Sequence, residues 1–83
     1  MKLLYFAWLR TKTGRAEEEI DLPAQVTTVA ELLAWLQNRG PGFAEALADP
    51  KAIRVAVNQE YARPGDPLAP GDEVALFPPV TGG

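Results

Sequence analysis

The sequence predicts an α+β fold with two layers, in which one main helix packs on one face of a mixed β-sheet. Three observations support this prediction. Residues 2–10 and 16–22 have the composition of two consecutive strands. Residues 28–39 begin with a helix cap and continue with an apolar stripe at helical spacing. Apolar residues alternate again in residues 53–58 and 73–77, so the chain ends in strands.

Composition excludes several classes of protein. The chain has 83 residues, enough for one small domain with one hydrophobic core. Its formal net charge is -3 and it has no cluster of Lys or Arg, which argues against a nucleic-acid-binding surface. Neither Cys nor His occurs, so disulfides and thiolate nucleophiles are excluded and we expect no metal site. The start of the chain is too short and too charged for a signal peptide, so we expect a cytoplasmic location.

The first strand is predicted over residues 2–10, where Leu, Tyr, Phe and Trp dominate. Its even positions include Lys2 and Arg10, so the even face should point to water. The odd positions should then face the core: Leu3, Tyr5, Ala7 and Leu9. A turn at residues 11–14 leads to the second strand, residues 16–22, with Ile20 and Leu22 inward and the acidic Glu17, Glu19 and Asp21 outward.

A capping box predicts that the main helix begins at Thr28, because the Thr28 hydroxyl can accept from the Glu31 amide while the Glu31 carboxylate reaches back. The apolar stripe consists of Val29, Leu32, Leu33 and Leu36. Gly40 and Pro41 are expected to end this helix. The following residues include Phe43 and Leu47, which predict a short second helix that ends before residue 50.

The C-terminal third is predicted to contain strands joined by turns. In residues 53–58, Ile53, Val55 and Val57 should point inward. The two Pro-Gly-Asp sequences, at residues 64–66 and 70–72, predict turns, with a short strand at residues 60–62. The last strand, residues 73–77, should bury Val74 and Leu76, so that Phe77 faces outward. Pro78 cannot donate to a sheet and is expected to end this strand.

The chain ends in Gly82 and Gly83, which can pass through a slot too narrow for larger residues and leave an unhindered carboxylate. A carboxylate becomes reactive when it attacks the α-phosphate of ATP, because the resulting acyl adenylate can be displaced by sulfide, thiols or amines. Six extended residues reach about 20 Å at about 3.3 Å each, so the tail can enter a deep cleft of another protein. The alternative is an inert, frayed end.

An exposed apolar patch is predicted on the sheet face away from the helix, formed by Leu4, Phe6, Trp8 and Phe77. Such patches usually mark protein interfaces. We therefore expect a partner interface made of these residues: Phe6, Trp8, Phe77, Pro78, Pro79 and Val80. The alternative is that part of this cluster belongs to the core.

The C-terminal segment, residues 68–83 (Leu-Ala-Pro-Gly-Asp-Glu-Val-Ala-Leu-Phe-Pro-Pro-Val-Thr-Gly-Gly), closely resembles the signature of the small-subunit family of molybdopterin synthase. Residues 5–7, residues 55–58 and the overall length are also similar to that family, whereas residues 39–51 are the least diagnostic. The resemblance implies a ubiquitin-like β-grasp fold, with a domain at residues 1–77 and an extended tail at residues 78–83.

The resemblance also implies a sulfur carrier. A ubiquitin-activating-like adenylyltransferase would use ATP to convert Gly83 to a glycyl adenylate and then to a 1-thioglycine thiocarboxylate. The tail residues Thr81, Gly82 and Gly83 would enter the partners' active sites. The large catalytic subunit would then pass the sulfur to cyclic pyranopterin monophosphate in molybdenum cofactor biosynthesis. The chain itself would bind no cofactor and act as a non-catalytic subunit, and the family pattern implies a heterotetramer.

Three other readings stay open at this point. The sulfur could go to another acceptor, as in tRNA thiolation or thiamine synthesis. The adenylate could instead form an isopeptide bond to a lysine, as in a ubiquitin-like protein modifier. A plain interaction domain with an inert tail would be unaffected by deletion of Gly82 and Gly83.

Overall fold

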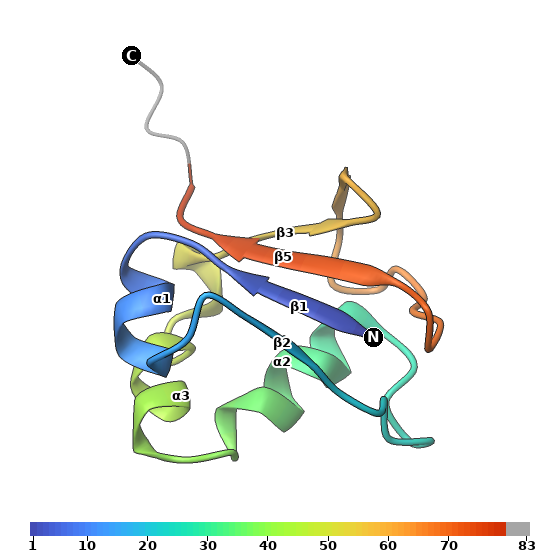
Figure 1. Ribbon diagram of the computed structural model, residues 1–83. Coiled ribbons are helices and arrows are strands. Elements are labelled where there is room, and N and C mark those ends of the chain that lie inside the picture. The colour runs from blue at the N-terminus through green and yellow to red at the C-terminus, as the bar shows by residue number, and fades with distance from the viewer. Residues whose placement is uncertain (80–83) are drawn as a thin grey trace.

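The computed structural model describes residues 1–79 and shows helices packed on one face of a β-sheet (Figure 1). The sheet has five strands in the order β2-β1-β5-β3-β4. The elements are β1 (Lys2–Tyr5), α1 (Trp8–Thr13), β2 (Glu17–Glu19), α2 (Val29–Gln37), α3 (Pro41–Ala46), the 3-10 turn η1 (Pro50–Ala52), β3 (Arg54–Val57), β4 (Glu60–Ala62) and β5 (Glu73–Phe77). The predicted two-layer α+β fold is therefore confirmed.

The last strand, β5, lies in the centre of the sheet. It pairs in parallel with β1, where Tyr5 lies opposite Leu76, and antiparallel with β3, where Arg54 lies opposite Phe77. β2 and β4 are the two edge strands and pair antiparallel with β1 and β3. The chain therefore reaches its C-terminal residues from the middle of the sheet, with other elements on both sides.

The core lies between the sheet and α2. The buried set includes the alternating residues predicted for the strands and the predicted stripe of α2: Leu3, Tyr5, Val55, Val74, Leu76, Val29, Leu32 and Leu36. Leu32 and Leu36 are fully buried, and burial of each such side chain contributes about 1.5–3 kcal/mol. None of the helices formed by residues 1–79 is long and apolar enough to span a bilayer.

The prediction of one strand over residues 2–10 is wrong. β1 ends at Tyr5, and the chain then turns, because Ala7 takes a φ of 54° and the Leu9 amide donates to the Phe6 carbonyl at 3.1 Å. Leu9 reaches the core from α1 rather than from a strand, and Ala7, predicted to be inward, is exposed.

The helix α1 also replaces the turn predicted at residues 11–14. Its last residue, Thr13, donates its hydroxyl to the Leu9 carbonyl at 2.8 Å, and Gly14 ends it with a φ of 78°. Helix α3 packs against it so closely that a Cβ on Gly42 would collide with the Lys12 carbonyl. The packing of α3 on α1 therefore outweighs the strand preference of the local sequence.

The capping box of α2 is confirmed. The Glu31 amide donates to the Thr28 hydroxyl at 3.2 Å, and the Glu31 carboxylate accepts from the Thr28 amide at 3.1 Å and the Thr27 amide at 2.9 Å. These hydrogen bonds, that from the Thr27 amide first, hold the pKa of Glu31 below its ordinary value. The helix ends at Gln37, earlier than predicted, and Gly40 with Pro41 instead begins the next helix.

The short second helix is confirmed as α3, with Phe43 and Leu47 buried. The second strand is shorter than predicted, Glu17–Glu19, but Ile20 and Leu22 pack on the core as expected. Both Pro-Gly-Asp turns are confirmed as well. The carboxylate of Asp66 accepts from the Arg63 amide at 2.8 Å, and that of Asp72 accepts from the Ala69 amide at 2.9 Å.

Candidate functional site at the end of the central strand

The candidate site lies where β5 ends. Phe77 is the last residue of the strand, as predicted, and Pro78 and Pro79 follow it and are partly buried. The remaining predicted site residues lie outside the described residues: Val80, Thr81, Gly82 and Gly83. Their roles, and the division of the chain into residues 1–77 and 78–83, therefore stay predictions. The structure shows the surface from which this tail departs.

On one side, the end of β5 is flanked by the turn between β1 and α1. The Phe6 amide donates to the Leu76 carbonyl at 3.1 Å, which places Phe6 beside the last residues of β5. The exposed fraction of Phe6 is 48% and that of Trp8 is 36%. Trp8 was predicted to be exposed on a strand, but it begins helix α1. The positive φ of Ala7 lies in a region that disfavours residues with a Cβ, and this strained turn presents both aromatic residues.

On the other side, an aromatic residue that the sequence analysis did not identify joins the patch. Tyr61 in β4 is 75% exposed, and its ring centroid lies 5.9 Å from that of Phe77. The strand registers connect one row across the open face of the sheet: Leu4, Ala75, Ala56 and Tyr61. The alternation of Tyr61 with the inward Ala62 on a short edge strand was the signal that could have identified it.

We call this surface the aromatic face and define it by Phe6, Trp8, Tyr61 and Phe77 with Leu4. Its strand residues, Leu4, Tyr61 and Phe77, lie on the face of the sheet opposite the buried strand residues, whereas Phe6 lies in the turn after β1 and Trp8 begins α1. A hollow of about 230 Å³ adjoins it, lined by Leu4, Tyr5, Phe6, Ala7, Arg10, Ala16 and Glu17. Large aromatic side chains with a neighbouring hollow are typical of protein interfaces.

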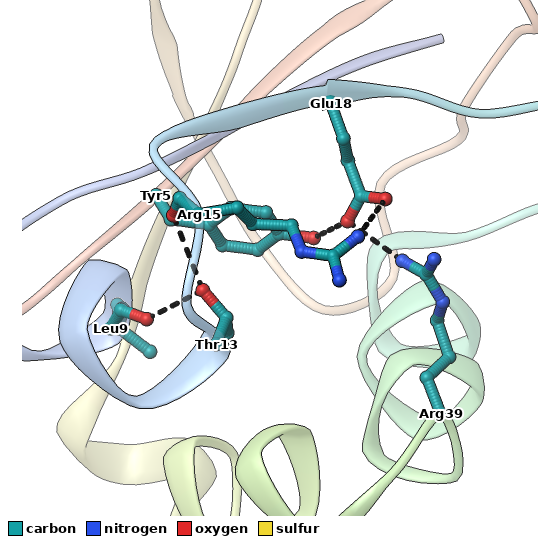
Figure 2. Close-up of polar contacts among 6 residues, drawn as sticks. All are labelled: Tyr5, Leu9, Thr13, Arg15, Glu18 and Arg39. Atoms are coloured by element: carbon teal, nitrogen blue, oxygen red, sulfur yellow. Dashed lines mark hydrogen bonds and ion pairs between the residues drawn. The ribbon is translucent and has the colours of Figure 1, made fainter.

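A polar cluster occupies the opposite side of β1, and the sequence analysis did not predict it (Figure 2). The carboxylate of Glu18 accepts from the Tyr5 hydroxyl at 2.6 Å, from Arg39 at 2.7 Å and from Arg15 at 3.1 Å. Both guanidinium groups also lie over the ring of Phe43, at 5.4 Å for Arg15 and 4.8 Å for Arg39. We call these five residues the Glu18 clamp.

The charge states of the clamp favour a structural role. Burial of Glu18 alone would raise its pKa, but the hydrogen bonds from Arg39 and Tyr5 and the two guanidinium charges outweigh it and hold the pKa below its ordinary value. Burial, followed by the hydrogen bond to Glu18, raises the pKa of the Tyr5 hydroxyl. The carboxylate thus stays ionised and the phenol protonated, so neither is prepared to exchange a proton near neutral pH.

Two further features do not form part of this site. Within residues 1–79, no group of three or more Asp or Glu side chains lies close enough together to hold a metal ion. A larger groove of about 450 Å³ runs between α2 and the β3–β4 hairpin, on the helix side of the sheet. The lining of this groove is mostly apolar and includes Val29, Leu33 and Val55, and the cationic residues Lys51 and Arg54 also border it.

Comparison with known proteins places the chain in a family. The model of the ThiS family matches residues 3–83. The molybdopterin synthase sulfur carrier subunit of Escherichia coli is 41% identical over 83 residues, covering 100% of this chain and 99% of the relative. The human subunit of the same name is 37% identical, covering 100% and 93%. A crystal structure of small archaeal modifier protein 1 from Haloferax volcanii has a TM-score of 0.73 at 32% identity, covering 96% and 97%. The chain therefore belongs to the ThiS family.

Proposed function

We propose that this chain is the sulfur carrier subunit of a molybdopterin synthase and that its Gly83 carboxylate is the group that carries sulfur. One observation supports the proposal most: the similarity runs from end to end of both chains, and the match to the family extends through Gly83. The position of β5 also supports it, because a central strand presents its C-terminal extension with folded structure on both sides.

The proposed first step is activation of Gly83. An oxygen of its carboxylate attacks the α-phosphorus of ATP on a ubiquitin-activating-like enzyme, and pyrophosphate leaves. The outer sulfur of a persulfide donor then displaces AMP from the acyl carbon and gives an acyl disulfide. A thiol cleaves its S–S bond by forming a disulfide with the donor sulfur, and the thiocarboxylate leaves. This chain contains no Cys, so it cannot carry the sulfur as a persulfide of its own, and the acyl carbon is the position left for it.

The proposed second step is transfer to cyclic pyranopterin monophosphate in the large subunit. The thiocarboxylate sulfur bonds to a carbon of the substrate and displaces an oxygen substituent from it. Water then cleaves the acyl–sulfur bond, which leaves the sulfur on the substrate and returns Gly83 as a carboxylate. A dithiolene holds two sulfur atoms, so each product requires two charged carriers. The catalytic groups are expected on the large subunit. The tail, Val80 to Gly83, contains no Lys or Arg, so that subunit should also supply the cations that bind the anionic thiocarboxylate.

We propose that the aromatic face binds the large subunit and the activating enzyme in turn. Phe6 and Phe77 lie at the end of the sheet where the tail departs, so a partner that binds them also receives the tail. Because one surface serves both partners, the carrier must dissociate from one before it binds the other. The two partners should therefore compete for it.

A second candidate function is that of a protein modifier. The similarity to small archaeal modifier protein 1 favours it, because the two proteins share the fold and about a third of their residues. In this case a lysine amine, instead of sulfide, would displace AMP from the Gly83 adenylate. The fold and the tail serve both reactions, and the acceptor alone distinguishes them.

Intact mass spectrometry tests the proposal. The chain is incubated with its activating enzyme, ATP, a persulfide donor and a thiol reductant, and we expect a mass increase equal to the difference between one sulfur and one oxygen. Attachment to lysines would instead support the modifier. A variant with one residue added after Gly83 is the control, and it should acquire no sulfur. The proposal fails if this extended variant still supports conversion of the pterin precursor at the normal rate.

A further inference from the structure

The eight cationic side chains of this acidic protein fall into two groups. Four form ion pairs with carboxylates: Lys2, Lys12, Arg15 and Arg39. The other four form no ion pair within residues 1–79: Arg10, Lys51, Arg54 and Arg63. The second group is therefore free to interact with charges on another molecule.

All four free cations lie at the end of the sheet where β5 ends. Arg54 lies opposite Phe77 in the β3–β5 register, and it donates to the Lys51 carbonyl at 3.4 Å. Arg63 directly follows Ala62, which pairs with Val55 next to Arg54. On the other side, Arg10 lines the hollow beside Phe6. In Figure 1 the end of β5 lies at the same end of the sheet as α1, in blue.

Carboxylates gather at the opposite end of the sheet. Glu19 and Glu73 lie on either side of Lys2 in the strand registers, and Asp72 precedes β5. Glu60 lies at the far end of the β3–β4 hairpin, opposite Val57. Four carboxylates lie near the free cations, and each already has a partner. Glu45 is paired with Lys12, and Glu17, which lines the hollow with Arg10, is paired with Lys2. Asp49 accepts from the Lys51 amide at 3.1 Å, and Asp66 accepts from the Arg63 amide at 2.8 Å. The sheet therefore has a cationic end and an acidic end, although the chain as a whole is negative.

We infer that Arg10, Lys51, Arg54 and Arg63 form a cationic collar around the base of the tail, and that it docks on acidic rims at the entrances of the partners' active sites. The inference rests on the proposed function, in which the tail enters those sites. Opposite charges across an interface mainly raise the association rate and set the orientation, here with the tail leading.

The collar and the tip of the tail should meet opposite charges. The thiocarboxylate at the tip is an anion and needs a cationic pocket. Six residues can reach about 20 Å when a partner's cleft holds them extended, which is well beyond the Debye length of about 8 Å at physiological ionic strength. A partner can thus present an acidic rim to the collar and a basic pocket to the tip with little interference between them.

A protein rim fits the collar better than a nucleic-acid backbone does. Arg54 and Phe77 are neighbours in register, so the collar is continuous with the aromatic face. An apolar centre with charged groups around it is the usual anatomy of a protein interface. The acidic end of the same sheet would in addition repel a long polyanion.

The test compares two double variants that change the net charge equally. Arg10→Gln with Arg54→Gln removes two collar charges, whereas Ala24→Glu with Gln25→Glu adds two negative charges at exposed positions outside the collar. Association with the large subunit is measured by stopped flow at about 20 mM and about 200 mM NaCl. We expect the collar variant to associate about tenfold more slowly at the lower salt, with little change in the dissociation rate. The control variant should associate at nearly the wild-type rate.

Equal association rates for the two double variants, or a wild-type rate that does not depend on salt, would overturn the collar. A second result would also overturn the collar: the wild type binds a single-stranded RNA oligonucleotide at about 150 mM salt and the collar variant does not. The partner of the collar would then be a polyanion. Intact mass analysis of every variant, after prolonged charging, separates this result from failure of the proposed function. If no chain acquires sulfur, the function is wrong, whereas normal charging with unchanged association rates contradicts only the collar.

Discussion

Two adjacent residues, Tyr5 at the end of the first strand and Phe6 directly after it, belong to regions with opposite roles. Tyr5 is 1% exposed, and its hydroxyl and ring both have partners in the Glu18 clamp. Phe6 is 48% exposed on the aromatic face, beside the end of β5. The polar and aromatic groups of the clamp find their partners within the molecule, whereas the aromatic side chains of the aromatic face remain available to another protein.

The arginines follow the same division. In the clamp, Arg15 and Arg39 share the carboxylate of Glu18, whose side chain is 11% exposed. In the collar, Arg10 and Arg54 have no carboxylate partner within residues 1–79. We conclude that substitutions in the clamp should mainly change stability, and substitutions in the aromatic face should mainly change binding. The following predictions test this division.

The largest expected effect is on stability, from Tyr5→Ala. Truncation of a fully buried aromatic side chain should lower the free energy of unfolding by about 3–5 kcal/mol, which approaches the total stability of a small domain. Denaturant unfolding measures it. Tyr5→Phe, which removes only the hydroxyl and its hydrogen bond to Glu18, should cost about 1 kcal/mol. Equal effects of the two substitutions would show that ring packing contributes little.

Phe77→Ala should mainly change binding. We expect the affinity for the large subunit to fall by about 30-fold, or about 2 kcal/mol, because Phe77 is half-buried at the end of β5 and aromatic residues at the centre of an interface are typical hot spots. Calorimetric titration measures the affinity. Trp35→Ala is the control, since Trp35 packs against the core and contacts Arg39, and it should change stability without changing affinity. A large loss of stability in Phe77→Ala, with normal binding, would assign Phe77 to the core instead.

Glu18→Gln should destabilise the protein in a pH-dependent way. At neutral pH we expect a loss of roughly 1–3 kcal/mol, because Arg39 and Arg15 lose their charged partner. The pKa of Glu18 is lowered in the folded protein, so its contribution is fully present above the unfolded value of about 4.3 and is lost as pH falls through the lower folded value. The stability difference between wild type and variant should therefore shrink below about pH 4. A difference independent of pH would argue against the charge as its cause.

The smallest expected effect is a gain in stability from Ala7→Gly. Ala7 has a φ of 54°, where the backbone strain of a residue with a Cβ costs about 1–3 kcal/mol, and Gly relieves this strain. Gly also makes the unfolded chain more flexible, which lowers the stability by about 0.5–1 kcal/mol. We expect a net stabilisation of about 1 kcal/mol. Ala34→Gly, at an exposed position inside α2, is the matched control and should destabilise by about 1 kcal/mol. Destabilisation by both substitutions would show that the turn at Ala7 is not strained.

The parts of the fold that were predicted correctly depend on neighbours in the sequence. The capping box joins Thr28 to Glu31 three residues later, and the alternation in residues 73–77 places Val74 and Leu76 in the core. The aromatic face was predicted in part for the same reason, since Phe6 and Phe77 follow from the positions of their inward neighbours. Tyr61 was missed because its strand has only three residues, which is too short for an alternating pattern to predict which side chains face outward.

The sequence by itself determined the two-layer fold, the core positions of its main strands and α2, and the glycine pair at the end of the chain, because periodicity, capping and backbone freedom are local properties. Only the tertiary structure decided that residues 8–13 form a helix, that β5 lies in the centre of the sheet, and that Glu18 joins Arg39, 21 residues away. Contacts between distant segments decide these features. No local pattern in the sequence contains the energy of such contacts.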